Sequence, residues 1–198
     1  MANKPIKIAL LGLGTVGTGV YKLLSMRADD MPQIAGAPIE ISHILVRNAS
    51  KPRSGVETAL LTDNWNDIIS DPEVSIVVEL MGGIEPAHTY IKEALQANKN
   101  VVTANKDLIA VHGGELLDLA EEHHCDLQFE ASVAGAIPII HPLKQSLAGN
   151  RITEIMGIVN GTTNYILTRM KEANASFPAA LGEARELGYL DANSTGKY

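Results

Sequence analysis

The chain has 198 residues, of which 45% are hydrophobic and 20% charged, with a formal net charge of −7. Such a composition is typical of a soluble globular protein, and the length suits one domain plus part of a second. An acidic chain without a basic stripe is a poor candidate for nucleic-acid binding. The single cysteine, Cys125, excludes an intramolecular disulfide.

The sequence shows no pattern of a targeting or membrane segment. Met1–Lys7 has neither a charged-then-apolar signal region nor an Arg/Ser-rich transit segment. No apolar run approaches the roughly 18 residues that a membrane span requires. We therefore expect a cytoplasmic protein with no membrane partner.

Apolar runs of strand length alternate with segments of helical period up to about residue 130. Strands are expected at Ile6–Leu11, Ile39–Val46, Ser75–Met81, Val101–Val102 and Asp126–Glu130. The first helix is expected to carry Val16, Val20, Leu23 and Leu24 on one face, and a short helix is expected at Trp65–Ser70. A third is expected from Pro86, with Ile91, Ala94 and Leu95 facing inward. A fourth is expected at Gly114–His124, with His112–Glu115 as a loop before its cap. Five strands joined by helical crossovers predict an α/β fold, a doubly wound parallel sheet of the Rossmann type.

The pattern changes after Gly149. Ile152–Val159 predicts a long strand, and Asn160 can cap a helix that runs to about Lys171. Ser176 can cap a last helix with Ala180, Ala184 and Leu187 facing inward and Gly188 as its C′ residue. One strand and two helices cannot bury their own apolar faces. We therefore expect residues 1–135 to form the dinucleotide-binding domain and residues 136–198 to be the incomplete start of a second α+β substrate and dimerisation domain.

A glycine-rich motif, Gly12-Leu13-Gly14-Thr15-Val16-Gly17, follows the first expected strand and opens the first helix. In that position Gly12 allows a tight turn, Gly14 lets the backbone approach a pyrophosphate, and Gly17 permits close helix–strand packing. The helix N-terminus adds N–H groups and a positive dipole end. The alternative is a glycine-rich turn that only packs; the flanking strand and helix favour dinucleotide binding.

The end of the second expected strand bears on the choice of cofactor. NAD-selective Rossmann domains usually carry an acid there, whereas this chain continues from Val46 with Arg47 and then Lys51 and Arg53. A guanidinium at Arg47 can stack on adenine and pair with a 2′-phosphate. The alternative is a solvated basic loop. The sequence favours NADP, with NAD still open.

Three further segments are more specific than the glycine motif: Val101–Lys106, Glu130–Pro138 and Gly157–Ile166. Together, and in this order, they resemble the homoserine dehydrogenase family from about Ile6 to Gly188. The resemblance implies NAD(P)-dependent interconversion of homoserine and aspartate 4-semialdehyde, in the biosynthesis of threonine, methionine and isoleucine. It also implies that the parent enzyme is a homodimer or homotetramer.

The resemblance assigns roles residue by residue. It implies that Lys106, at the carboxyl end of the sheet, is a functional lysine that orients substrate, contacts cofactor or transfers a proton; alone, it would pass for an exposed cation. Cofactor contacts are implied at Gly12, Leu13, Gly14, Thr15, Val16, Gly17, Arg47, Lys106 and Gly188. Substrate contacts are implied at Gly161, Thr162 and Asp191, of which the first two would otherwise be an ordinary helix cap.

The resemblance also implies a monovalent cation, sodium, with a structural role. By matching position its ligands are Glu130, Val133, Gly135 and Ile137, which would offer a carboxylate and backbone carbonyl oxygens suited to a hard cation. The alternative is a plain strand-to-helix turn in which Glu130 is an N-terminal charge.

The resemblance ends near the last residues. Gly188 and Tyr189 match the family, and Asp191 stands where the family has a substrate-binding Glu, one methylene longer. Nothing aligns beyond Asp191, and Lys197 comes too early to be the family's proton-transferring lysine. We therefore expect this chain to bind cofactor and to turn over slowly or not at all.

Two other functions remain open: another Rossmann oxidoreductase acting on an amino-acid aldehyde or alcohol, and a non-catalytic NADP-binding or regulatory module.

His123-His124-Cys125 is not expected to form a metal site, because the side chains of adjacent residues on a helix point about 100° apart.

Overall fold

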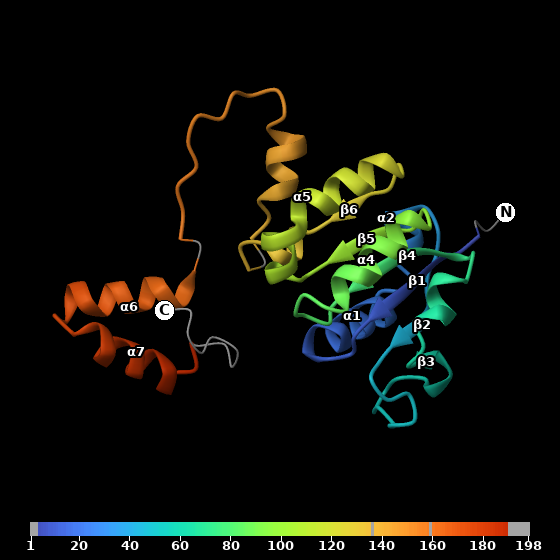
Figure 1. Cartoon of the computed structure of the whole chain (residues 1–198), viewed down its shortest axis with the longest axis horizontal. Helices are drawn as coiled ribbons and strands as arrows, with labels where there is room; N and C mark the ends of the chain where they lie inside the picture. Colours follow the sequence, from blue (N-terminus) through green and yellow to red (C-terminus); the bar gives the residue numbers. More distant parts are fainter. Residues whose placement is uncertain (1–3, 136, 159, 190–198) are drawn as a thin grey trace. The chain divides into compact units, whose positions relative to one another are not determined.

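The computed structural model describes residues 4–135, 137–158 and 160–189. The chain divides into two compact units, residues 1–144 and 145–198. Figure 1 shows the first unit as a sheet flanked by helices and the second as a pair of helices.

The first unit alternates strands and helices along the chain. Its strands are β1 (Ile6–Leu11), β2 (Ile39–Leu45), β3 (Leu61–Thr62), β4 (Val74–Glu79), β5 (Asn100–Thr103) and β6 (Leu127–Gln128). Its α-helices are α1 (Thr15–Met26), α2 (Met31–Ala35), α3 (Asn66–Ile69), α4 (Ala87–Gln96) and α5 (Lys106–Glu122). Short 3₁₀ turns lie at Thr58–Leu60 and Glu130–Ser132, and a π-helical turn lies at Pro142–Ser146.

The six strands form one parallel sheet in the order β3-β2-β1-β4-β5-β6. The chain works outward from β1 to β3 and then returns to β4, so that the strand order reverses between β1 and β4. In open α/β sheets, ligands bind outside the carboxyl ends of the strands at such a reversal. The topology therefore directs attention to the segments that follow β1, β2 and β4.

The central strand β1 is buried on both faces. Ala9 and Leu11 belong to the hydrophobic cluster formed with α4 and α5, whereas Ile8 and Leu10 belong to the cluster that includes α1. Alternating side chains of a strand point to opposite faces, so a strand covered on both sides is apolar where it is buried, here from Ile8 to Leu11. The doubly wound α/β fold expected from the sequence is thus confirmed.

The second unit contains α6 (Gly161–Glu172) and α7 (Phe177–Glu186), which pack on each other around Ile166, Ala180 and Ala184. The Asn160 side chain accepts the Thr163 N–H, and the Ser176 hydroxyl accepts the Ala179 N–H. Both expected helix caps are therefore present.

Helix α7 ends as expected at Gly188. This residue has φ of +75°, and its N–H donates to Arg185 while the Tyr189 N–H donates to Ala184. These two hydrogen bonds form a Schellman motif, for which glycine is favoured because the left-handed conformation has no Cβ penalty.

Other expectations differ from the structure. Residues 152–158 form no strand, and Val159 lies outside the described residues. A β-strand requires a pairing partner, and none of the described strands pairs with this apolar run. Helix α5 begins at Lys106, not at Gly114, so His112–Glu115 is helical and not a loop. The two-residue β3 and the short α2 were not anticipated.

Three apolar residues expected to face inward are more than half exposed: Val16, Leu23 and Leu187, at 54%, 56% and 57%. In α1, Val20 and Leu24 do pack on the sheet. No helix in the described ranges combines the length and apolar character needed to cross a membrane.

Candidate functional site

The glycine-rich turn brings the start of α1 directly against the end of β1. A Cβ on Gly17 would lie 2.2 Å from the carbonyl oxygen of Gly12, a distance that no real contact tolerates. Gly12 has φ of +102°, and a Cβ there would lie 3.1 Å from the Leu80 carbonyl oxygen. Gly14 differs, because a Cβ on it would have no neighbour within 4 Å. Packing therefore requires glycine at positions 12 and 17, whereas Gly14 leaves open space above the turn.

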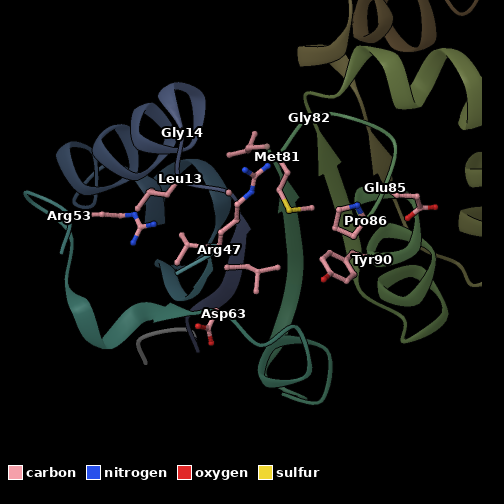
Figure 2. Close-up of a pocket in the computed structure, with 14 residues that line it drawn as sticks. Leu13, Gly14, Arg47, Arg53, Asp63, Met81, Gly82, Glu85, Pro86 and Tyr90 are labelled. Atoms are coloured by element: carbon pink, nitrogen blue, oxygen red, sulfur yellow. The ribbon is translucent and has the colours of Figure 1, made fainter. Parts of the chain in front are cut away.

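A cavity of about 480 Å³ lies beside this turn, where the strand order reverses. Figure 2 shows the glycine-rich turn and two arginines on one side, and Met81, Pro86 and Tyr90 on the other. The complete lining is Gly12, Leu13, Gly14, Leu45, Val46, Arg47, Arg53, Asp63, Leu80, Met81, Gly82, Glu85, Pro86 and Tyr90. A cavity lined mostly by apolar residues and glycines, with a few charged side chains, is characteristic of a cofactor site.

The two arginines of the pocket come from the loop after β2. Arg47 is exposed, directly after the buried Val46. One guanidinium nitrogen of Arg53 donates to the carbonyl oxygens of Asn48 and Lys51, at 3.2 and 2.9 Å. Arg53 thereby holds the loop closed, while Arg47 contributes its positive charge to the pocket.

A buried carboxylate shapes the other wall. Glu79, the last residue of β4, is fully buried, and its Oε1 accepts the N–H groups of Met81 and Gly82 at 2.8 and 3.3 Å. Its Oε2 accepts the hydroxyl of Thr103 on β5 at 2.6 Å, and that hydroxyl oxygen accepts the N–H of Asn105 at 3.0 Å. Buried polar groups that are all hydrogen-bonded in this way fix a unique arrangement. One carboxylate therefore joins the pocket wall to the entry of α5.

Asn105 continues this network into α5. Its Nδ2 donates to the Gly83 carbonyl at 2.6 Å, and its Oδ1 caps the helix by accepting the Leu108 N–H at 3.2 Å. The next residue, Lys106, opens α5 with an exposed side chain. Lys106 thus lies at the carboxyl edge of the sheet, as the sequence predicts, on a helix end held by a buried network.

The carboxylate of Glu130 holds the backbone of the segment that follows it. It accepts the N–H groups of Ile139, Ile140 and His141, at 2.6, 2.9 and 2.7 Å, and these hydrogen bonds keep its pKa below the usual range. Both oxygens are thus engaged at the start of the following helical turn. Glu130, Val133, Gly135 and Ile137 offer carboxylate and backbone carbonyl oxygens that suit a hard cation, and carboxylate oxygens that accept N–H groups in this way keep lone pairs that an ion can use.

The predicted substrate residues lie in the second unit. Gly161 and Thr162 form the first turn of α6, and the Thr162 hydroxyl donates to the carbonyl oxygen of Tyr189. Asp191 lies outside the described residues. Gly188 terminates α7 as described above. Thr162 therefore ties the start of α6 to the end of α7.

The structure gathers Gly12, Leu13, Gly14 and Arg47 around one cavity. Thr15 and Val16 are exposed on the first turn of α1, and Gly17 is buried beneath it. Sequence reasoning missed Asp63, Met81, Glu85 and Tyr90. The sequence could have indicated them only by their position after a strand: Met81 and Glu85 follow β4, and Asp63 follows β3, which the sequence analysis does not predict.

A glycine-rich turn at the switch point of a parallel sheet, with a cavity beside it, defines a dinucleotide-binding Rossmann domain. Residues 12–130 match the family described as the NAD-binding domain of homoserine dehydrogenase, and residues 138–196 match the family described as homoserine dehydrogenase. The chain belongs to the homoserine dehydrogenase family, whose members are oxidoreductases.

Comparison with individual proteins and solved structures supports the same family. Homoserine dehydrogenase from Bacillus subtilis is 47% identical over 193 residues, which cover 97% of this chain and 45% of the relative. A crystal structure of the enzyme from Thiobacillus denitrificans matches with a TM-score of 0.86 and 44% identity, over 97% of this chain and 44% of that one. A hyperthermophilic archaeal homoserine dehydrogenase in complex with NADPH matches with a TM-score of 0.77 and 26% identity, over 96% of this chain and 63% of that one. The chain thus spans less than half the length of the first two relatives.

Replacing Gly17 with alanine tests the packing of the turn. Because the new Cβ would overlap the Gly12 carbonyl, we expect G17A to destabilise the fold by about 1–3 kcal/mol or more, measured by urea unfolding. G19A is the matched control on the same helix, where a Cβ meets nothing within 4 Å. Alanine is the better helix former, so G19A should leave stability equal or raised by up to about 1 kcal/mol. Equal stabilities of the two variants would contradict this account.

Proposed function

We propose that the pocket binds NADP(H), with the pyrophosphate at the glycine-rich turn and the 2′-phosphate against Arg47. The observation that carries the proposal is the open space above Gly14, at the N-terminus of α1, within reach of a cavity that Arg47 lines. Backbone N–H groups and the positive end of the helix dipole favour an anion there. Met81 and Gly82 line another side of this pocket, and hydrogen bonds from their N–H groups to Glu79 hold them in place.

The charges around the pocket favour NADP over NAD. No acid occurs between Val46 and Arg53, where an NAD-selective domain would bond the ribose hydroxyl. Asp63 does line the cavity, but it follows β3, the neighbouring edge strand, and not β2. The archaeal relative solved with NADPH adds support for this cofactor.

For the whole protein we propose the interconversion of L-homoserine and L-aspartate 4-semialdehyde, within amino-acid biosynthesis. A bound nicotinamide would supply the acceptor for the hydride of the homoserine alcohol carbon, and residues of this protein would orient the hydroxyl and take its proton. We assign Lys106, at the entry of α5, to orient the reacting oxygen or to transfer its proton. The assembled enzyme is proposed to be a homodimer or homotetramer acting in the cytoplasm.

The start of α6 is proposed to bind the homoserine carboxylate. The Thr163 N–H is taken by the Asn160 side chain, and the Asn164 N–H by the Asn160 carbonyl. The N–H groups of Gly161 and Thr162 have no acceptor within an α-helix, by helix geometry, and can point to an anion. A sodium ion would be held by oxygens of Glu130, Val133, Gly135 and Ile137 in a structural role, and no chemical step is assigned to it.

Replacing Arg47 tests the cofactor assignment. Loss of a charge-assisted contact worth about 1.5–3 kcal/mol should weaken NADPH binding roughly 10-fold to 100-fold, with NADH binding little changed. The measurement is a fluorescence titration of R47A with each nucleotide. K51A is the matched control, since Lys51 lies on the same loop outside the pocket lining. An equal loss for both nucleotides, or none, would contradict the 2′-phosphate assignment.

The activity of the 198-residue polypeptide is a separate test. The chain spans 45% of the Bacillus subtilis relative. Reaction rates require the substrate and the proton-transferring groups to be held together, so we expect NADPH binding with little homoserine-dependent NADP⁺ reduction. Nicotinamide absorbance measures the turnover, with a full-length relative as the positive control. Turnover by this polypeptide comparable to that of the relative would refute the expectation.

A further inference from the structure

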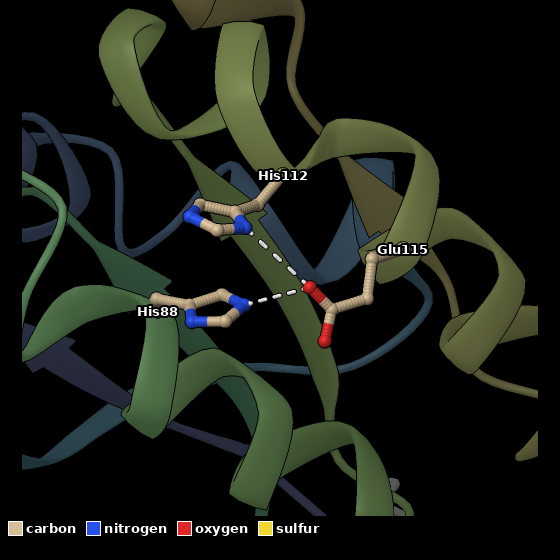
Figure 3. Close-up of side chains that lie close together, drawn as sticks. All are labelled: His88, His112 and Glu115. Carbon is tan, nitrogen blue, oxygen red and sulfur yellow. Dashed lines mark hydrogen bonds and ion pairs between the residues drawn. The ribbon is translucent and has the colours of Figure 1, made fainter.

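A cluster of two histidines and a glutamate lies on α4 and α5, apart from the proposed cofactor contacts. His88 comes from the first turn of α4, while His112 and Glu115 lie three residues apart on α5. Figure 3 shows both imidazole rings directed at one carboxylate. Within the described ranges, this is the group of three His, Cys, Asp or Glu side chains with the spacing of a metal site.

Two of the three separations between donor atoms are those of a tetrahedral metal site, and all three atoms lie within 4.8 Å of one another. His88 Nε2 lies 3.1 Å from Glu115 Oε2, and His112 Nδ1 lies 3.4 Å from the same oxygen. Zinc holds nitrogen and oxygen ligands at about 2.0–2.1 Å, which places tetrahedral donors about 3.3 Å apart. The two rings are stacked with centroids 4.0 Å apart. The three atoms could therefore surround one ion with small side-chain rotations.

The groups behind the three donors are arranged as they are around bound metals. The other ring nitrogen of His88, Nδ1, lies 3.3 Å from Glu85 Oε1, and the other oxygen of Glu115 accepts the Lys92 ammonium. Metal-binding histidines usually donate their second N–H to a carboxylate, and metal-binding carboxylates are themselves hydrogen-bonded. In a metal-bound site such partners orient the His88 ring and the Glu115 carboxylate.

Charge and access also suit a cation. The side chains of His88, His112 and Glu115 are 14%, 29% and 45% exposed, so the site is partly dry yet open to solvent. The Glu115 carboxylate forms an ion pair with Lys92, whose Nζ lies 2.5 Å from Oε1. Lys92 also places a positive charge beside the site, which should weaken cation binding.

We propose that His88, His112 and Glu115 bind a zinc ion or a similar borderline divalent metal, with water at the fourth position. Two imidazole nitrogens and one carboxylate are a donor set that zinc accepts when it keeps an open position. The opposing interpretation is an ion-pair cluster that joins α4 to α5 and takes no metal. A zinc site predicts that the chain binds zinc through these three side chains, whereas an ion-pair cluster predicts that it does not.

The test is a zinc titration of the untagged, chelator-treated chain, by calorimetry and by competition with a chromophoric chelator. We expect one zinc ion per chain at micromolar affinity, and at least about tenfold weaker binding in H88Q and in H112Q. Cobalt substitution should give the intense visible bands of a tetrahedral site. The matched control is H123N/H124N, which alters the histidines at the end of the same helix and should bind as the unaltered chain does.

A further variant separates metal binding from a general loss of structure. K92M removes the competing ammonium, so it should tighten zinc binding while H112Q weakens it. Unfolding in excess chelator checks that each variant is folded; if H88Q is not, H112Q and K92M carry the test. Zinc binding that is absent in the unaltered chain, or unchanged in both H112Q and K92M, would overturn the proposal.

Discussion

The site depends on a contact that permits no side chain, the approach of Gly17 to the carbonyl oxygen of Gly12. A Cβ at position 17 would lie 2.2 Å from that oxygen. Only this approach lets α1 begin directly at the carboxyl end of β1, so that its N–H groups and dipole face the cavity. On the opposite wall the buried Glu79 carboxylate fixes the segment after β4 and, through Thr103, the entry of α5. A backbone contact and a buried anion thus hold the two sides of one pocket.

Much of this arrangement could be predicted from the sequence, because its causes are local. A strand covered on both faces is apolar where it is buried, as β1 is from Ile8 to Leu11. Gly12 and Gly17 follow from the geometry of a strand–turn–helix, and the caps at Asn160 and Ser176 follow from side-chain hydrogen bonding to the helix start. The family resemblance added the roles of residues such as Lys106, which local chemistry does not assign.

The remaining features depend on what each segment meets in space. Residues 152–158 have the composition of a strand but no described partner, and α5 continues through Gly113 because packing outweighs the roughly 1 kcal/mol that a helical glycine costs. Tyr90 lines the pocket from a helix that sequence reasoning did not connect with it. His88 and His112 are far apart in the chain, and only the packing of α4 on α5 brings them to one carboxylate.

The central claim is that the edge of the sheet between β1 and β4 binds the dinucleotide, and amide NMR of the isotopically labelled chain tests it most directly. On addition of NADPH, the account predicts the largest shifts at the amides of Gly12, Gly14, Arg47, Met81 and Gly82. Amides on the far side, such as those of the loop before β5, should remain unchanged. Binding with shifts confined to other surfaces, or no shifts at the glycine-rich turn, would contradict the account.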